Sequence, residues 1–228
     1  MLAIVEFEKA LADAVAAWRA DHSVIAGFIG FLANAELFKA AALMAFALAA
    51  VLRSGEPLLC ARNGFLLRFF AAGLAAIAAG RFLQITLPHR DRPMVALTDW
   101  ASHSAFGAES SFPSDHAVYL AAMATAIVFI DRRIGSLAVA WTVFIALLPR
   151  IVLNYHYPTD IIAGAAIGAV ITGLCMRAPI PRSVLDGAAA AARKAPHVVY
   201  PLLFLLAFEA GTNFKMARAG ADALLRLF

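Results

Sequence analysis

Charged residues are scarce in this 228-residue chain. Asp, Glu, Lys and Arg make up 15% of the sequence, whereas hydrophobic residues make up 63% and the mean hydropathy is +0.80. A soluble globular domain carries about a quarter charged residues, so the composition excludes that class and is typical of a protein that crosses a membrane several times. We expect a single domain over 1–228, built as one helical bundle.

Cysteine is also scarce. Cys60 and Cys175 are the two cysteines of the chain, and both fall near predicted helix ends on the side that we assign below to the cytoplasm. Disulfides are rare in that compartment, so the sequence predicts no disulfide framework and a structural role for both thiols.

The N-terminal segment lacks the basic start and the uninterrupted apolar core of a cleavable signal peptide. Over residues 2–20, apolar side chains repeat at helical spacing while charged residues occupy the other faces; the apolar positions are Phe7, Leu11, Ala14 and Trp18. This pattern predicts an amphipathic helix that lies at the membrane interface.

Apolar runs dominate the rest of the chain. They predict spanning helices at 36–52, 64–87, 114–130, 134–153 and 160–176, and the shorter run 198–210 would add a sixth. Most of these runs approach the ~20 residues needed to cross ~30 Å of hydrocarbon. Residues 177–228 are then a linker followed by the sixth span. The predicted fold class is all-α, a polytopic membrane helical bundle of five to six spans.

Two pairs of residues within these runs have simple structural interpretations. Gly164 and Gly168 are spaced for close helix contact, which we expect inside this chain rather than in a dimer, although the oligomeric state stays open. Glu36 and Lys39 lie three residues apart on one helix face, so we expect them to neutralise each other.

Positive charge gathers on one side of the predicted bundle. The linkers on that side carry Arg53, Arg62, Arg132, Arg133, Arg177, Arg182, Arg193 and Lys194. By the positive-inside rule this side faces the cytoplasm, which turns segments 88–113 and 154–159 outward. We therefore expect an inner-membrane protein whose functional loops face the periplasm or the cell exterior.

Three ionisable residues stand between apolar runs at this predicted outer surface: Arg150, His156 and Asp160. Ionisable side chains are costly near lipid, so they indicate a functional site. If Asp160 begins the next helix, its carboxylate can lie within reach of His156 and fix which ring nitrogen carries the proton. An imidazole oriented in this way can act as a nucleophile.

Segment 88–113 brings further cations to the same surface. Arg90 and Arg92 follow the second span, and Ser114 and His116 begin the third. Ser114 is a good helix cap, and both the free N–H groups of a helix start and the guanidinium forks favour phosphate oxygens. The combined site offers no compact ligand set for a divalent metal, so we expect activity to survive EDTA.

The spacing of these residues resembles three signature motifs of the type-2 phosphatidic acid phosphatase superfamily. The matching positions are Arg92-Pro93, then Pro113-Ser114-Asp115-His116, then Arg150 with His156 and Asp160, in that order over residues 64–176. The superfamily also includes the vanadium haloperoxidases, but those enzymes are soluble, whereas this chain is built of membrane spans.

The resemblance implies a role for each matched residue. His156 would attack phosphorus and form a phosphohistidine, with Asp160 orienting it, and His116 would protonate the leaving oxygen and later activate water. The implied phosphate-binding residues are Arg92, Ser114 and Arg150, and we place Arg90 and Asp115 in the same predicted set. Neither a metal nor another cofactor is implied, because positioned cations and backbone donors can stabilise a phosphoryl-transfer transition state.

Three positions depart from the family pattern. Ile85 stands where the first motif has Lys, Asp115 where the second has Gly, and Pro149 where the third has Ser. Arg81 lies one helical turn before Ile85, and a long Arg side chain can reach back toward the interface. We predict that Arg81 takes over part of the role of the missing lysine.

The substrate implied by the resemblance is a lipid phosphate in the bilayer. Asp115, with Ser111-Phe112 before it and Tyr157-Pro158 after the nucleophile, resembles the bacterial undecaprenyl-diphosphatase branch, which is associated with bacitracin resistance and cell envelope biogenesis. That branch implies cleavage of undecaprenyl diphosphate to undecaprenyl phosphate, with Arg90 as an extra cation for the second phosphate. Phosphatidylglycerol phosphate, phosphatidic acid and lipid A phosphate are alternative substrates.

A transporter that binds anions is the rival from a different class. Transport sites tend to lie near the bilayer midplane on broken helices, whereas these motif residues cluster at one interface, which favours an enzyme. No nucleic-acid partner is expected. The remaining histidines that we considered, His22, His89 and His103, are expected to be polar surface groups.

Overall fold

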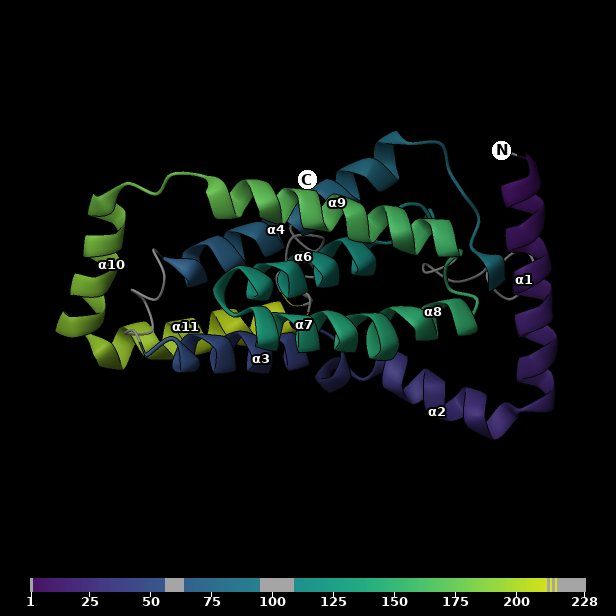
Figure 1. The fold of residues 1–228 in the computed structure, drawn as a ribbon, viewed down its shortest axis with the longest axis horizontal. Coiled ribbons are helices and arrows are strands. Elements are labelled where there is room, and N and C mark those ends of the chain that lie inside the picture. The colour runs from purple at the N-terminus through teal and green to yellow at the C-terminus, as the bar shows by residue number, and fades with distance from the viewer. Residues whose placement is uncertain (1, 56–63, 95–108, 213, 215, 217–228) are drawn as a thin grey trace, which may run out of the picture.

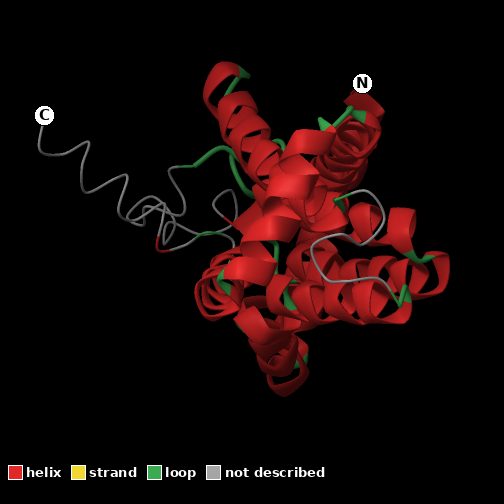
Figure 2. Ribbon diagram, turned by 90° about the vertical axis from the view of Figure 1, so that its left-hand side faces the viewer, coloured by secondary structure: helices red, strands yellow, loops and turns green. Residues whose placement is uncertain are grey.

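The computed structural model describes residues 2–55, 64–94, 109–212, 214 and 216. Every regular element among them is a helix (Figure 2). The predicted all-α class is therefore confirmed, and Cys60 and His103 lie outside the described residues.

Three helices of the described part are long and apolar enough to cross a membrane: α4 (Phe65–Thr86), the continuous run Arg132–Val152 and α9 (Pro158–Arg177). The apolar helices α3 (Ala40–Arg53), α6 (Asp115–Ile130) and α11 (Pro196–Gly211) are shorter. Figure 1 shows all of these helices running along the long axis of the bundle. The predicted positions of the spans agree closely with these bounds, except for the first.

The first span is shorter than the sequence suggested. Residues 23–34 form a separate helix, α2 (Ser23–Asn34), which a turn of 3₁₀ helix, η1 (Glu36–Phe38), separates from α3. The break lies at the predicted charge pair, because Lys39 Nζ is 3.1 Å from a Glu36 carboxylate oxygen and the Lys39 backbone leaves the helical region.

Two further helices lie across the ends of the bundle (Figure 1). α1 (Leu2–Asp21), drawn in purple, crosses one end, where we expected an interfacial helix. α10 (Arg182–Lys194) crosses the other end. We had predicted residues 179–194 as a linker, but their alanine-rich run has a strong helix propensity and folds accordingly.

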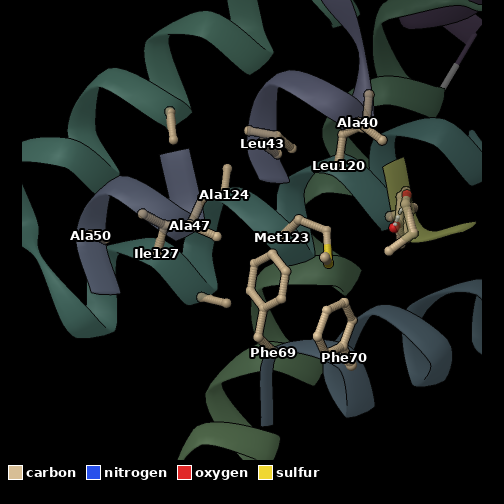
Figure 3. Close-up of a cluster of buried hydrophobic side chains, with 14 of the residues drawn as sticks. Ala40, Leu43, Ala47, Ala50, Phe69, Phe70, Leu120, Met123, Ala124 and Ile127 are labelled. Carbon is tan, nitrogen blue, oxygen red and sulfur yellow. Dashed lines mark hydrogen bonds between the residues drawn. The ribbon is translucent and has the colours of Figure 1, made fainter. Parts of the chain in front are cut away.

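The core is organised around α6, which is buried over most of its surface, with Phe129 near its end exposed. Its side chains Leu120 and Met123 are buried in one cluster with Phe69 of α4 and Leu43 of α3 (Figure 3). Tyr119 of α6 belongs to the same cluster. A helix that is apolar all round belongs in the centre of a bundle. This burial fixes the position of the N-terminus of α6, which carries Ser114 and His116.

α9 packs directly on α6 through two of its glycines. A Cβ atom added to Gly168 would lie 2.1 Å from the carbonyl oxygen of Val118, and one added to Gly164 would lie 2.8 Å from the carbonyl oxygen of Ser114. The backbones are therefore too close for any larger residue. The predicted packing inside the chain is confirmed, and it brings the second motif against the third.

The helix that carries Arg150 contains one wide segment. α7 (Arg132–Trp141) continues through a π-helical stretch, η3 (Thr142–Leu147), into α8 (Leu148–Val152). Pro149 lies just after the wide segment and has no N–H group for an α-helical bond. The π-helical stretch accommodates this proline, and Arg150 follows directly at the end of the helix.

Candidate active site

Backbone hydrogen bonds hold the three motif loops together at the end of the bundle that α1 crosses. Met94 N–H donates to the Asn154 carbonyl at 2.9 Å, and Ser111 N–H donates to the Arg90 carbonyl at 2.8 Å. Ser114 N–H donates to the Asp160 carbonyl at 3.2 Å. Residues that are far apart in the sequence thus form one site.

His156 is fully buried in this site, with 1% of its surface exposed. Its Nδ1 atom lies 3.0 Å from the Ser111 carbonyl oxygen, which can only accept, and its Nε2 atom lies 3.1 Å from Arg92 Nη1, which can only donate. Nδ1 therefore carries the proton and Nε2 carries the lone pair. Burial, together with the nearby guanidinium groups of Arg92 and Arg150, holds the pKa of His156 well below its ordinary value, so the ring is neutral.

Asp160 reaches His156 through a serine. The Asp160 Oδ2 atom is 3.9 Å from His156 Nδ1, which is too long for a hydrogen bond. Instead, Ser111 Oγ donates to Oδ2 at 2.5 Å and lies 3.3 Å from Nδ1. Asp160 also accepts from Tyr157 N–H at 2.8 Å in a capping box at the start of α9. The expected direct pairing of carboxylate and imidazole is thus replaced by a three-residue chain.

His116 has a different environment at the N-terminus of α6. Asp115 Oδ1 accepts from the His116 backbone N–H at 2.7 Å and lies 2.9 Å from its Nδ1 atom. We had placed Asp115 among the phosphate-binding residues, but its carboxylate is bound to the second histidine. Ser114 caps α6 as predicted, with Oγ accepting from Ala117 N–H at 3.4 Å.

Arg92 and Arg150 are both buried in this region. Arg92 Nη1 donates to the Tyr155 carbonyl at 3.3 Å as well as facing His156. Arg150 acts electrostatically on Arg92 and Asp115, and its buried Nε has no hydrogen-bond partner within the described part of the chain. A buried donor without a partner is costly, and a phosphate oxygen would satisfy it.

The two other predicted cations are already engaged. Arg90 pairs with Asp160 Oδ1 and with Glu8 Oε2, each at 2.6 Å. Arg81 Nη2 lies 2.9 Å from Glu109 Oε1, and its Nη1 donates to Gln84 at 3.2 Å. The structure therefore places Arg90 behind Asp160, and it places Arg81 at the rim.

Two other histidines that the structure describes, His22 and His89, are surface groups. His89 lies 3.2 Å from Asp91, and His22 bonds the Trp18 carbonyl. Within the residues that the structure describes, no three His, Cys, Asp or Glu side chains lie close enough together to hold a metal ion. Metal independence stays a prediction for experiment.

Sequence reasoning missed two members of the site. Ser111 was noticed only as part of a run that precedes His116, and Glu8 only as one of the charged residues of the N-terminal helix. Helical periodicity could have placed Glu8 near the buried Ala12, which is four residues away on the same face. No local pattern indicates the fold around Ser111, because its partners lie 45 and 49 residues further along the chain.

A cavity of about 690 Å³ lies beside the site, between α1 and the motif loops. It is bordered by Ile4, Val5 and Lys9 on α1 and by Phe112 and Tyr157 on the loops. Its lining also includes Glu8 and Arg90 but neither His116 nor His156, so the cavity lies on the Glu8 and Arg90 side of Asp160.

Comparison with known proteins gives the family. The chain is 33% identical over 79 residues to a lipid A 1-phosphatase of Rhizobium johnstonii and 32% identical over 78 residues to one of Rhizobium etli. These matches cover 35% and 34% of this chain, and the chain spans about a third of each relative's length, 31% and 32%. No solved structure matches. Residues 65–182, which contain all three motifs, match the PAP2 superfamily, and the chain belongs to it.

Proposed function

We propose that this protein is a membrane lipid phosphatase that works through a phosphohistidine on His156. One observation carries the proposal. The imidazole is buried and neutral, its Nδ1 proton faces the Ser111 carbonyl, and its Nε2 lone pair faces the guanidinium of Arg92. This lone pair is the nucleophile of the proposal, and Arg92 must turn from Nε2 to a phosphoryl oxygen before Nε2 can attack phosphorus.

The proposed first step transfers the phosphoryl group to His156. Nε2 forms a bond to phosphorus while the bond to the leaving oxygen breaks, and His116 gives its proton to that oxygen. Asp115, 2.9 Å from His116 Nδ1, stabilises the charged ring before the transfer. Arg92 and Arg150 offset the charge that spreads over the phosphoryl oxygens.

The proposed second step releases phosphate. His116, now neutral, removes a proton from water, whose oxygen attacks phosphorus and breaks the bond to Nε2. Each residue returns to its starting protonation state.

We propose the phosphate of a lipid A-type glycolipid as the substrate. The relatives named above point to this class. Undecaprenyl diphosphate stays a second candidate because the run from Ser111 to His116 resembles that branch. Its support is weaker, because Arg90, which was expected to bind a second phosphate, is held by two carboxylates.

Phosphate release from purified protein tests both proposals. The panel is lipid A, undecaprenyl diphosphate, phosphatidic acid and phosphatidylglycerol phosphate in the same detergent, with and without EDTA. We expect activity that survives EDTA and kcat/KM at least tenfold higher, or about 1.4 kcal/mol, for lipid A. A tenfold preference for another lipid would replace the proposed substrate, and no hydrolysis of any lipid would reject the proposed activity.

We propose that the site opens to the periplasm or the cell exterior, in an inner-membrane protein. The basic linkers support this orientation, because α10, which carries Arg182, Arg193 and Lys194, crosses the end of the bundle opposite α1 (Figure 1). Asp91 is exposed beside the site. In a variant without Cys60 and Cys175, Asp91→Cys should react with a membrane-impermeant thiol reagent in cells with a permeabilised outer membrane. Labelling only after lysis would reverse the orientation.

A further inference from the structure

Glu8 is a buried carboxylate on a helix that is otherwise largely exposed. Only 3% of its surface is accessible, whereas Phe7 beside it is 64% exposed. Its Oε1 atom accepts from the backbone N–H of Thr159 at 2.9 Å and from the Thr159 hydroxyl at 2.7 Å. Thr159 lies in the first turn of α9, so a side chain of α1 caps the helix that carries Asp160.

The other carboxylate oxygen of Glu8 leads to the nucleophile. Oε2 accepts from Arg90 Nη2 at 2.6 Å, and Arg90 Nη1 donates to Asp160 Oδ1 at 2.6 Å. Asp160 Oδ2 in turn holds the Ser111 hydroxyl, which lies 3.3 Å from His156 Nδ1. A continuous chain of charge-assisted hydrogen bonds therefore runs from α1 to the ring of His156.

Two more bonds fix α1 to the segment around His156. Asn154 Nδ2 donates to the Ala12 carbonyl at 3.0 Å, and Arg19 Nη1 donates to the Leu153 carbonyl at 3.1 Å. Asn154 has a positive φ of 57°, a conformation that Asn tolerates better than most residues. α1 thus contacts the turn before His156 as well as the helix that follows it.

This hydrogen-bond chain contains two carboxylates and one guanidinium. Although burial opposes its ionisation, hydrogen bonds from Thr159 and Arg90 hold the pKa of Glu8 below its usual value. Arg90 therefore faces two carboxylates, and its guanidinium also lies 4.2 Å from the centre of the Tyr157 ring. Loss of Glu8 would free one arm of Arg90 and allow it to change its pairing with Asp160.

We propose that Glu8 is a positioning residue for the nucleophile, and that α1 sets the orientation of His156 through Arg90, Asp160 and Ser111. This inference rests on the proposed function, because the hydrogen-bond chain ends at the histidine that we propose to attack phosphorus. α1 is thereby part of the active site rather than only an interfacial anchor.

Glu8→Gln tests the inference, with Glu6→Gln as the matched control. Glu6 lies on the same helix and is exposed. The amide introduced by Glu8→Gln would turn an NH₂ group toward either Arg90 or Thr159, so a donor would face a donor. On lipid A in detergent we expect Glu8→Gln to lower kcat by at least tenfold with KM changed less than threefold, and Glu6→Gln to behave like the wild type.

Two further measurements separate positioning from folding. Glu8→Gln and Ser111→Ala both interrupt the hydrogen-bond chain to His156. The double variant should therefore lose little more activity than the less active single variant. Glu8→Asp keeps the charge and should fall between Glu8→Gln and the wild type. The inference is wrong if Glu8→Gln keeps the wild-type kcat. It is also wrong if the fold-decrease of kcat in the double variant equals the product of the fold-decreases in Glu8→Gln and Ser111→Ala. If Glu8→Gln does not fold, an Asp variant with wild-type kcat overturns it.

Failure of the proposed function would be visible separately. If the wild type hydrolyses no lipid phosphate, nitrogen NMR of histidine-labelled protein still reports on the ring of His156, assigned with His156→Asn. The inference predicts that Glu8→Gln shifts those signals and Glu6→Gln does not. Unchanged His156 signals in Glu8→Gln would overturn it whatever the activity is.

Discussion

The two histidines of the site differ in what holds them. His156 is buried between loops, with a carbonyl group at Nδ1 and a guanidinium at Nε2. His116 stands at the start of a helix, has a side chain that is 22% exposed, and has a carboxylate 2.9 Å from its Nδ1 atom. Burial and Arg150 disfavour a proton on both rings, but at His116 a carboxylate in direct contact with the ring opposes this effect.

This difference supports the roles that we propose for the two histidines. A ring that stays neutral and keeps a fixed lone pair is suited to bond formation, whereas a ring beside a carboxylate and partly open to solvent is suited to exchange of a proton with water. Geometry therefore separates two residues of the same type without reference to their order in the sequence.

Replacing either histidine should lower the rate of phosphate release more than any other change. His156→Ala removes the only proposed nucleophile and should reduce phosphate release to background. His116→Ala should lower kcat by about 10²- to 10⁴-fold, the usual contribution of a general acid, and should let a phosphoenzyme accumulate from a substrate with a good leaving group. Acid-quenched labelling with a radioactive phosphate ester measures the intermediate. Full activity of either variant would reject the mechanism.

The close contact of α6 with α9 keeps the two histidines together. In Gly168→Ala the new Cβ would lie 2.1 Å from the Val118 carbonyl oxygen. We expect the free energy of unfolding in detergent to fall by about 3 kcal/mol. Gly187→Ala is the control, because its Cβ meets nothing within 4 Å and alanine favours the helix. Equal stability of the two variants would contradict the packing.

Ser111 lies beside His156, with its Oγ atom 3.3 Å from Nδ1. Ser111→Ala removes the hydroxyl between Asp160 and His156 but keeps the backbone carbonyl that accepts from Nδ1. The ring should keep its tautomer and lose part of its alignment, so we expect kcat to fall about tenfold, the equivalent of one hydrogen bond of about 1.4 kcal/mol. A loss below twofold would show that Asp160 acts without Ser111.

The sequence predicted the helices and the motif residues well, because apolar run length and motif spacing are local properties. It placed α4, α6 and α9 within about two residues of their observed bounds. It did not predict the partners of Arg90 and Asp160, since Glu8 lies 82 residues from the first and Ser111 lies 49 residues from the second. Those contacts depend on how α1 crosses the bundle, and no periodicity in the sequence encodes that docking.

The pH dependence of stability should report on the neutral ring of His156. The pKa of His156 is lowered in the folded protein, so below about pH 6.5 the unfolded chain binds a proton that the folded chain does not. Through this residue, the free energy of unfolding therefore decreases as the pH falls, by up to about 1.4 kcal/mol per pH unit. Thermal unfolding in detergent at pH 7.5 and 5.5 should show a smaller decrease for His156→Asn than for the wild type. An equal decrease would mean that the ring is protonated.

The smallest effect is expected at Arg81, on the rim of the His156 side. Its side chain is 51% exposed and holds Glu109, whose other oxygen lies 3.8 Å from Arg92 Nη2. In Arg81→Ala, Glu109 would lose its nearer partner and compete with the substrate phosphate for Arg92. We therefore expect KM to rise about threefold to fivefold while kcat stays constant. A change of this size lies within the ~1 kcal/mol of an exposed ion pair. Glu109→Gln in the same variant should restore KM, because an amide does not compete for a guanidinium. If Arg81→Ala changes neither constant, Arg81 takes no part of the role of the missing lysine. A loss of kcat beyond a hundredfold would instead give it the whole of that role.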